Sequence, residues 1–82
     1  MSEELRWKIL DILVRKRRYT KNYTFGAEEI AKEINIGLDY VHEELDKMEY
    51  LGLVELFKSL GPTYAAEVTP AGLLAYDEAG KD

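Results

Sequence analysis

Apolar residues recur at helical spacing from the start of the chain to residue 14. One stripe, on a single helical face, consists of Leu5, Ile9, Ile12 and Leu13. A second stripe, roughly a third of a turn away, consists of Trp7, Leu10 and Val14. A helix that is apolar on two faces packs one face on its own domain and needs a different cover for the other. Ser2 predicts the start of this helix, and the cations at 15–18 suit its end.

Residues 28–55, EEIAKEINIGLDYVHEELDKMEYLGLVE, have the pattern of a short helix, a tight turn and a longer helix. The inward positions of the short helix are Ala27, Ile30, Ala31 and Ile34. The turn is Asn35-Ile36-Gly37, in which Asn and Gly tolerate left-handed backbone. The inward positions of the longer helix are Leu38, Val41, Leu45, Met48 and Leu51. Gly52 predicts a left-handed cap that ends this helix.

From residue 54 onward the apolar period shortens to about 2, which is typical of strands. Residues 54–58 and 64–68 alternate around a Gly61-Pro62 turn and therefore predict a hairpin. Thr69 before Pro70 predicts the start of a final helix. A very short strand is expected at residues 24–25. We therefore expect a single domain, residues 1–82, of the α+β class with mostly α structure.

Charge is unevenly distributed along the chain, whose net charge is −5. Residues 1–23 hold seven Lys/Arg against three Asp/Glu, whereas residues 24–56 hold two against nine. Such an acidic chain is excluded as a non-specific nucleic-acid binder, because the nucleic-acid backbone is itself negative. The segment RKRRYTKNY at 15–23 is the only candidate for a local basic patch.

Cysteine is absent from the sequence. Disulfides, thiolate metal sites and thiol nucleophiles are therefore excluded. No apolar stretch approaches the roughly 20 residues of a membrane span. The acids Glu3 and Glu4, which precede any apolar stretch, do not fit a secretion signal. We therefore expect a cytoplasmic protein without a membrane partner.

The order of elements and two segments resemble the winged helix-turn-helix superfamily, above all its small archaeal and bacterial regulators of the MarR and PadR type. Residues 28–55 carry the short helix, the glycine turn and the Leu-Gly-Leu step into a strand. VTPAGLLAY at 68–76 carries a Thr-Pro-x-Gly entry into the last helix. The resemblance covers nearly the whole chain and implies the order helix, short strand, helix, turn, helix, β-hairpin wing and helix. It is more specific for fold than for function.

The resemblance implies a transcriptional regulator that binds double-stranded DNA as a homodimer. The helix that starts at residue 38 would enter the major groove, and the hairpin wing would contact the neighbouring backbone. The cations ahead of the second helix would contact phosphates. The DNA-contacting residues expected on this basis are Arg15, Lys16, Arg17, Arg18, Lys21, Tyr40, His42, Lys47, Lys58 and Thr63.

The charge of that third helix supports an alternative. It offers no Arg, Asn or Gln for reading bases, and its acids are Asp39, Glu43, Glu44 and Asp46. Like unit charges some 8 Å apart repel by roughly 2 kcal/mol at an effective dielectric of about 20. The alternative is a winged-helix protein-interaction module that meets a basic partner surface and does not bind DNA. The cations at 15–18 would then only complement the end of the first helix or pair with acids.

The second apolar stripe of the first helix contains the only tryptophan and predicts a face that must be covered. Either the final helix covers it, through Leu73, Leu74 and Tyr76, or a second copy of the chain does. We favour a second copy, because a two-fold contact is the commonest way to bury such a face. The dimer-interface residues expected are Trp7, Leu10, Val14, Leu74 and Tyr76.

No catalytic or metal-binding constellation is predicted. His42 is the only histidine, and one histidine among scattered carboxylates lacks the spacing of a metal site. The acids of the third helix fit a solvated face better than the apolar pocket of a general acid or base. No phosphate-binding glycine loop or nucleophile elbow is present. We therefore expect neither an enzyme nor a cofactor.

Overall fold

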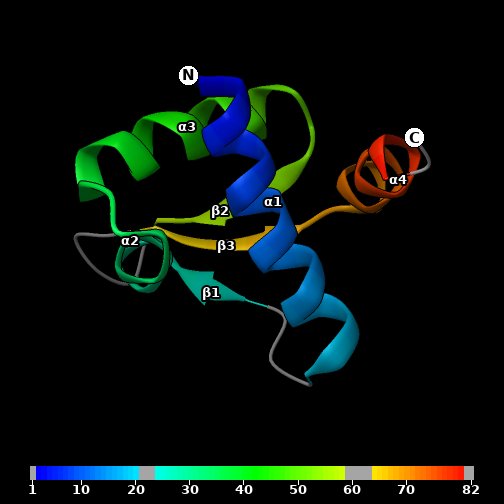
Figure 1. Cartoon of the computed structure of the whole chain (residues 1–82), viewed down its shortest axis with the longest axis horizontal. Helices are drawn as coiled ribbons and strands as arrows, with labels where there is room; N and C mark the ends of the chain where they lie inside the picture. The colour runs from blue at the N-terminus through cyan, green and yellow to red at the C-terminus, as the bar shows by residue number, and fades with distance from the viewer. Residues whose placement is uncertain (1, 21–23, 59–63, 81–82) are drawn as a thin grey trace.

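The predicted order of helices and strands is confirmed by a computed structural model, which describes residues 2–20, 24–58 and 64–80. Within these residues, four helices surround a small three-stranded antiparallel sheet (Figure 1). The elements are α1 (Ser2–Tyr19), β1 (Phe25–Gly26), α2 (Ala27–Ile34), α3 (Leu38–Tyr50), β2 (Val54–Phe57), β3 (Ala65–Val68) and α4 (Pro70–Ala79). The fold is therefore α+β and mostly helical, as the periodicity predicts.

Helix α1 is the centre of the core, because it contacts all three other helices and the central strand β3. Both of its predicted stripes are covered within the chain. Leu10 and Val14 are fully buried, so the prediction that these two residues face a second copy is wrong. The final helix covers this face instead, as in the other alternative: α4 packs on α1, and the Tyr76 hydroxyl donates a hydrogen bond to Asp11 Oδ1. Trp7, by contrast, keeps 37% of its surface exposed.

The turn between α2 and α3 uses left-handed backbone at Asn35, where φ is 56°. The Ile36 amide donates to the Ala31 carbonyl at 3.1 Å and closes the end of α2. Because Asn tolerates this conformation better than most residues, the turn needs no glycine at this position. The turn therefore sets the direction in which α3 leaves the core.

The end of α3 is a left-handed glycine cap, as predicted. Gly52 has a φ of 80°; its amide donates to Glu49 O at 3.0 Å, and the Leu53 amide donates to Met48 O at 2.9 Å. These two bonds are the Schellman pattern. The cap also corrects one prediction, because Leu51, expected on the inward face, is 51% exposed where the helix ends.

The sheet has the strand order β1-β3-β2, and all pairs are antiparallel. Val54 lies opposite Val68, and Ala66 lies between Leu56 and Phe25. The alternation therefore points Val54, Ala66 and Val68 into the core, where all three are buried. The short first strand begins one residue later than predicted. The Gly61-Pro62 turn lies outside the described residues.

The Thr-Pro-x-Gly segment joins α4 to the end of α3. The Thr69 hydroxyl accepts from the Gly72 amide at 3.0 Å and donates to the Gly52 carbonyl at 2.6 Å. A Cβ atom at Gly72 would lie 2.2 Å from the Leu53 carbonyl oxygen, so only glycine fits there without movement. Within the described residues, no helix is long and apolar enough to span a membrane.

Candidate recognition surface

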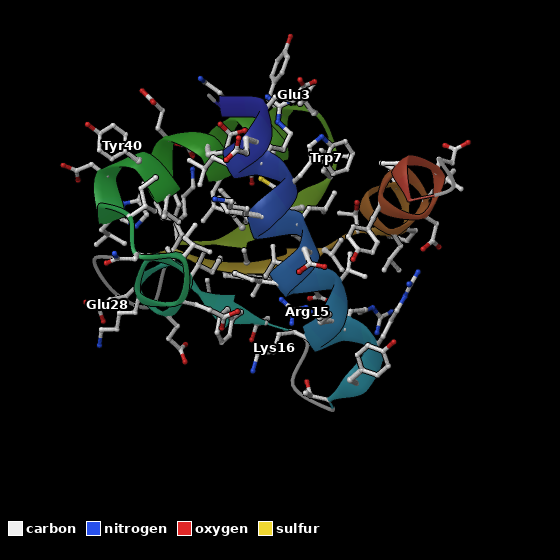
Figure 2. All side chains as sticks on the ribbon, in the orientation of Figure 1. Glu3, Trp7, Arg15, Lys16, Glu28 and Tyr40 are labelled. Carbon is white, nitrogen blue, oxygen red and sulfur yellow. The ribbon has the colours of Figure 1, made fainter. Side chains whose placement is uncertain are left out.

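One side of α3 faces away from the core along its whole length. Val41, Glu44, Leu45 and Met48 are buried, whereas the residues on the opposite side of the helix are exposed. Figure 2 shows Tyr40 projecting from the free side of this helix. We call this surface the α3 outer face; its exposed residues are Asp39, Tyr40, Glu43, Lys47 and Tyr50.

Asp39 and Glu43 give the first half of the α3 outer face its charge. Among the described residues, no Lys or Arg nitrogen lies within 4.0 Å of either carboxylate. Asp39 lies in the first helical turn, where the helix dipole favours an acid. Both carboxylates are therefore exposed and free to meet a positive group from outside.

Glu44, which the sequence pattern groups with these acids, is not part of the α3 outer face. Only 2% of its side chain is exposed, and Arg6 Nε of α1 donates to its Oε2 at 2.8 Å. A paired carboxylate of this kind holds two helices together and presents little field to solvent. Position 44 lies three residues after Val41 and four before Met48, so helical periodicity could have placed it inward. No sequence pattern predicts that Arg6 is its partner, because the two residues are 38 positions apart in the chain.

A cluster at the base of the wing ties the hairpin to α3. Lys58 Nζ lies 3.3 Å from Asp46 Oδ1 and 3.9 Å from Glu49 Oε1, and it sits 4.7 Å from the centre of the Tyr64 ring. The hydrogen bond to Asp46 is the first cause that raises the pKa of Lys58. The Tyr64 ring in turn stacks on His42 with the centroids 4.3 Å apart. Lys58 and His42, both predicted to contact DNA, are therefore engaged inside the chain.

The predicted phosphate contacts of α1 lie at a different edge of the molecule. Figure 1 shows the end of α1 at the bottom of the view, whereas α3 begins at the left edge. Arg15 pairs with Asp11 at 2.7 Å, Lys16 lies 4.5 Å from the centre of the Phe25 ring, and Arg18 pairs with Asp77 of α4 at 2.7 Å. Arg17 also has an interaction partner. We call these four residues the basic end of α1.

Position, more than pairing, separates the basic end of α1 from the α3 outer face. Exposed ion pairs contribute only about 0–1 kcal/mol and can be exchanged for other partners. However, strand β1 and helix α2 intervene between the two surfaces in the chain. The contact of these four cations with phosphates stays a prediction. Tyr40, His42 and Lys47 lie on α3 and Lys58 directly follows β2, whereas Lys21 and Thr63 fall outside the described residues.

A groove at the end of α3 was not predicted. It has a volume of about 390 Å³ and a mostly apolar wall. The residues that line it are Arg6, Asp46, Lys47, Tyr50 and Leu51. Tyr50 is 90% exposed, and the exposure of Leu51 follows from the helix cap. Among the described residues, no group of three or more His, Asp or Glu side chains could hold a metal ion.

The three-stranded sheet, the helix-turn-helix and the exposed third helix beside a hairpin define a winged helix-turn-helix fold. A crystal structure of a "putative dna-binding protein" from Ralstonia eutropha JMP134 is similar to this chain, with a TM-score of 0.81 and 14% sequence identity. The match covers 93% of this chain and 94% of that one. No protein-family model matches the chain, and no curated protein matches its sequence. At this identity the likeness shows the fold, and the MarR or PadR type stays a prediction.

Proposed function

We propose that this chain is a winged-helix interaction module whose α3 outer face binds a basic protein surface. The observation that carries this proposal is the pair of exposed carboxylates, Asp39 and Glu43, at the leading half of α3. In this fold the third helix is the element that enters the major groove when DNA is bound. Here that element offers acids where phosphates would lie close.

The sign of the interaction decides between the two classes of partner. Each phosphate some 8 Å from an exposed carboxylate costs roughly 2 kcal/mol at an effective dielectric of about 20, before screening by salt. A lysine or arginine of a partner at the position of the phosphate is attracted to the carboxylate instead. An exposed ion pair of this kind contributes up to about 1 kcal/mol to binding. The charge of Lys58 is already partly neutralised by Asp46 and Glu49. The same groups that disfavour DNA therefore favour a basic protein.

Charge reversal on α3 tests the proposal with a matched control. We expect Asp39→Lys together with Glu43→Lys to weaken binding of a lysine-rich peptide about tenfold, because two ion pairs become two repulsions. The control is Glu55→Lys together with Glu78→Lys, which changes net charge equally at exposed positions outside α3. Fluorescence anisotropy of the labelled peptide gives both dissociation constants. Equal losses in the two variants would show binding to net charge alone and would contradict the proposal.

DNA binding by a regulator is the second candidate function, and the likeness to a protein named for DNA binding favours it. It would use Tyr40, His42, Lys47 and Lys58 for contacts from α3 and the wing, and the basic end of α1 for phosphates. This candidate predicts retention of duplex DNA at low ionic strength that falls steeply with salt. An electrophoretic shift at increasing salt measures it. Salt-dependent retention would favour DNA binding over the interaction module.

A homodimer belongs to this second candidate. Trp7 and Leu74 are the exposed members of the predicted interface, and a groove of about 550 Å³ lies beside Trp7 between α1 and α4. Tyr76, also predicted there, lines this groove and is bonded to Asp11. If two copies join through this face, Trp7→Ala should lower the sedimentation mass from two chains to one. A parent protein that sediments as one chain would end the dimer proposal.

A further inference from the structure

The groove at the end of α3 has the chemistry of a pocket for an apolar side chain. Its wall is mostly apolar, and the ring of Tyr50 and the side chain of Leu51 supply exposed carbon surface. Leu51 is exposed because the glycine cap turns the chain away directly after it. Exposed apolar surface in a concave site is typical of the anchor position of an interface.

The charged groups in the wall of this groove are already matched. Arg6 is fixed by Glu44 at 2.8 Å, so its guanidinium is neutralised and its carbon stem forms part of the wall. Asp46 is matched by Lys58 at 3.3 Å. Lys47 remains as the one described wall residue with an unmatched charge. A ligand group that fills the groove therefore gains from apolar contact and only little from charge.

Helix geometry fixes the distance from this groove to the free carboxylates. Glu43 precedes Tyr50 by seven residues and Asp39 precedes it by eleven, which gives about 10 Å and about 16 Å at a rise of about 1.5 Å per residue. Steps of four, four and three residues along 39, 43, 47 and 50 keep these positions on one helical face. The α3 outer face therefore presents an apolar groove at one end and two acids at fixed spacing from it.

We propose that the partner segment is a basic amphipathic helix that lies antiparallel to α3. One large apolar side chain fills the groove beside Tyr50 and Leu51, and Lys or Arg residues seven and eleven positions later meet Glu43 and Asp39. The antiparallel direction places these cations toward the C-terminal end of the partner helix, where its own dipole favours them. This inference rests on the proposed function and adds to it the spacing and the anchor of the partner.

Three alanine-based helical peptides test this arrangement. The first carries leucine with lysines seven and eleven residues later, the second replaces the leucine with alanine, and the third moves both lysines to the opposite helical face. Each is titrated by fluorescence anisotropy into the parent protein and into the variant Tyr50→Ser/Leu51→Ser. Tyr19→Ser, at an exposed tyrosine on α1, serves as the matched control. The thermal unfolding midpoint shows whether each variant is folded, and Tyr50→Ser alone replaces the double variant if Leu51→Ser disturbs the cap.

We expect loss of the peptide leucine to weaken binding to the parent protein and to Tyr19→Ser about tenfold, the usual size for one well-buried apolar anchor. The same loss should have no effect on the Tyr50→Ser/Leu51→Ser variant, because its groove no longer holds the anchor. An equal effect in parent and variant, or none in either, would overturn the anchor proposal. Moving the lysines tests the proposed function separately: if it leaves binding unchanged, the acidic face is not the binding surface, whatever the anchor does.

Discussion

Thr69 and Gly72 show how single residues set the geometry of the whole fold. The Thr69 hydroxyl bonds to Gly52 at the end of α3 and to the first turn of α4, so one side chain joins two helices. Gly72 allows the backbone of α4 to approach the Leu53 carbonyl. The sequence motif that suggested the start of a helix thus also fixes where that helix lies.

Gly72→Ala is therefore expected to destabilise the protein by about 3 kcal/mol, because the added methyl meets backbone and cannot be accommodated by a side-chain rotation. Urea unfolding followed by circular dichroism measures the change. Gly80→Ala is the control, since its nearest neighbour would lie 3.5 Å away. If both substitutions have the same small effect, the close approach at Gly72 does not hold in solution.

At the scale of elements, two polar contacts fasten α4 to α1. The Tyr76 hydroxyl bonds to Asp11, and Arg18 pairs with Asp77 at 2.7 Å. The hydrogen bond to Asp11 is the largest cause that raises the pKa of Tyr76, and burial adds to it. A tyrosine with a raised pKa in the folded state stabilises the fold below its ordinary pKa of about 10 and loses that contribution as the pH rises through the raised value.

Removal of this hydroxyl should therefore change the alkaline part of the stability profile. Tyr76→Phe is expected to be less stable than the parent protein at pH 8, and the difference should shrink as the pH rises above about 10. Urea midpoints of both proteins between about pH 8 and 11 give this difference directly. Tyr50→Phe, at an exposed position without this bond, controls for general alkaline effects. A difference that stays constant with pH would contradict the assigned bond.

The limits of prediction from sequence are also clearest at the scale of elements. Helical and strand periods, the Asn35 turn and the Gly52 cap predicted the order of the elements and most of their boundaries, because these are local properties. The burial of Leu10 and Val14 was predicted but its cause was not, because one sequence cannot show whether α4 or a second copy covers a face. The pairing of Glu44 with Arg6 and the groove beside Leu51 were missed for the same reason: both depend on contacts between distant segments.

At the scale of the whole molecule, the acids of α3 that lack a described cation partner and the cations at the basic end of α1 lie at different edges. The α3 outer face carries exposed acids, and the basic end of α1 lies at another edge beside α4 (Figure 1). Neutralisation within the chain leaves Asp39 and Glu43 as the acids of α3 without a described cation within 4.0 Å. The third helix thus has the position that a DNA-reading helix takes in this fold, but its exposed acids have the opposite charge from that of a typical DNA reader.

Chemical-shift mapping on the uniformly ¹⁵N-labelled protein tests this account most directly. The protein is titrated at low ionic strength with a lysine-rich peptide and, separately, with a mixed-sequence duplex. We predict that the peptide shifts the amide signals of Asp39, Tyr40 and Glu43, and that the duplex leaves them unchanged. The opposite result would contradict this account: the duplex shifts the amide signals of these α3 residues, added salt abolishes those shifts, and the peptide does not shift the signals.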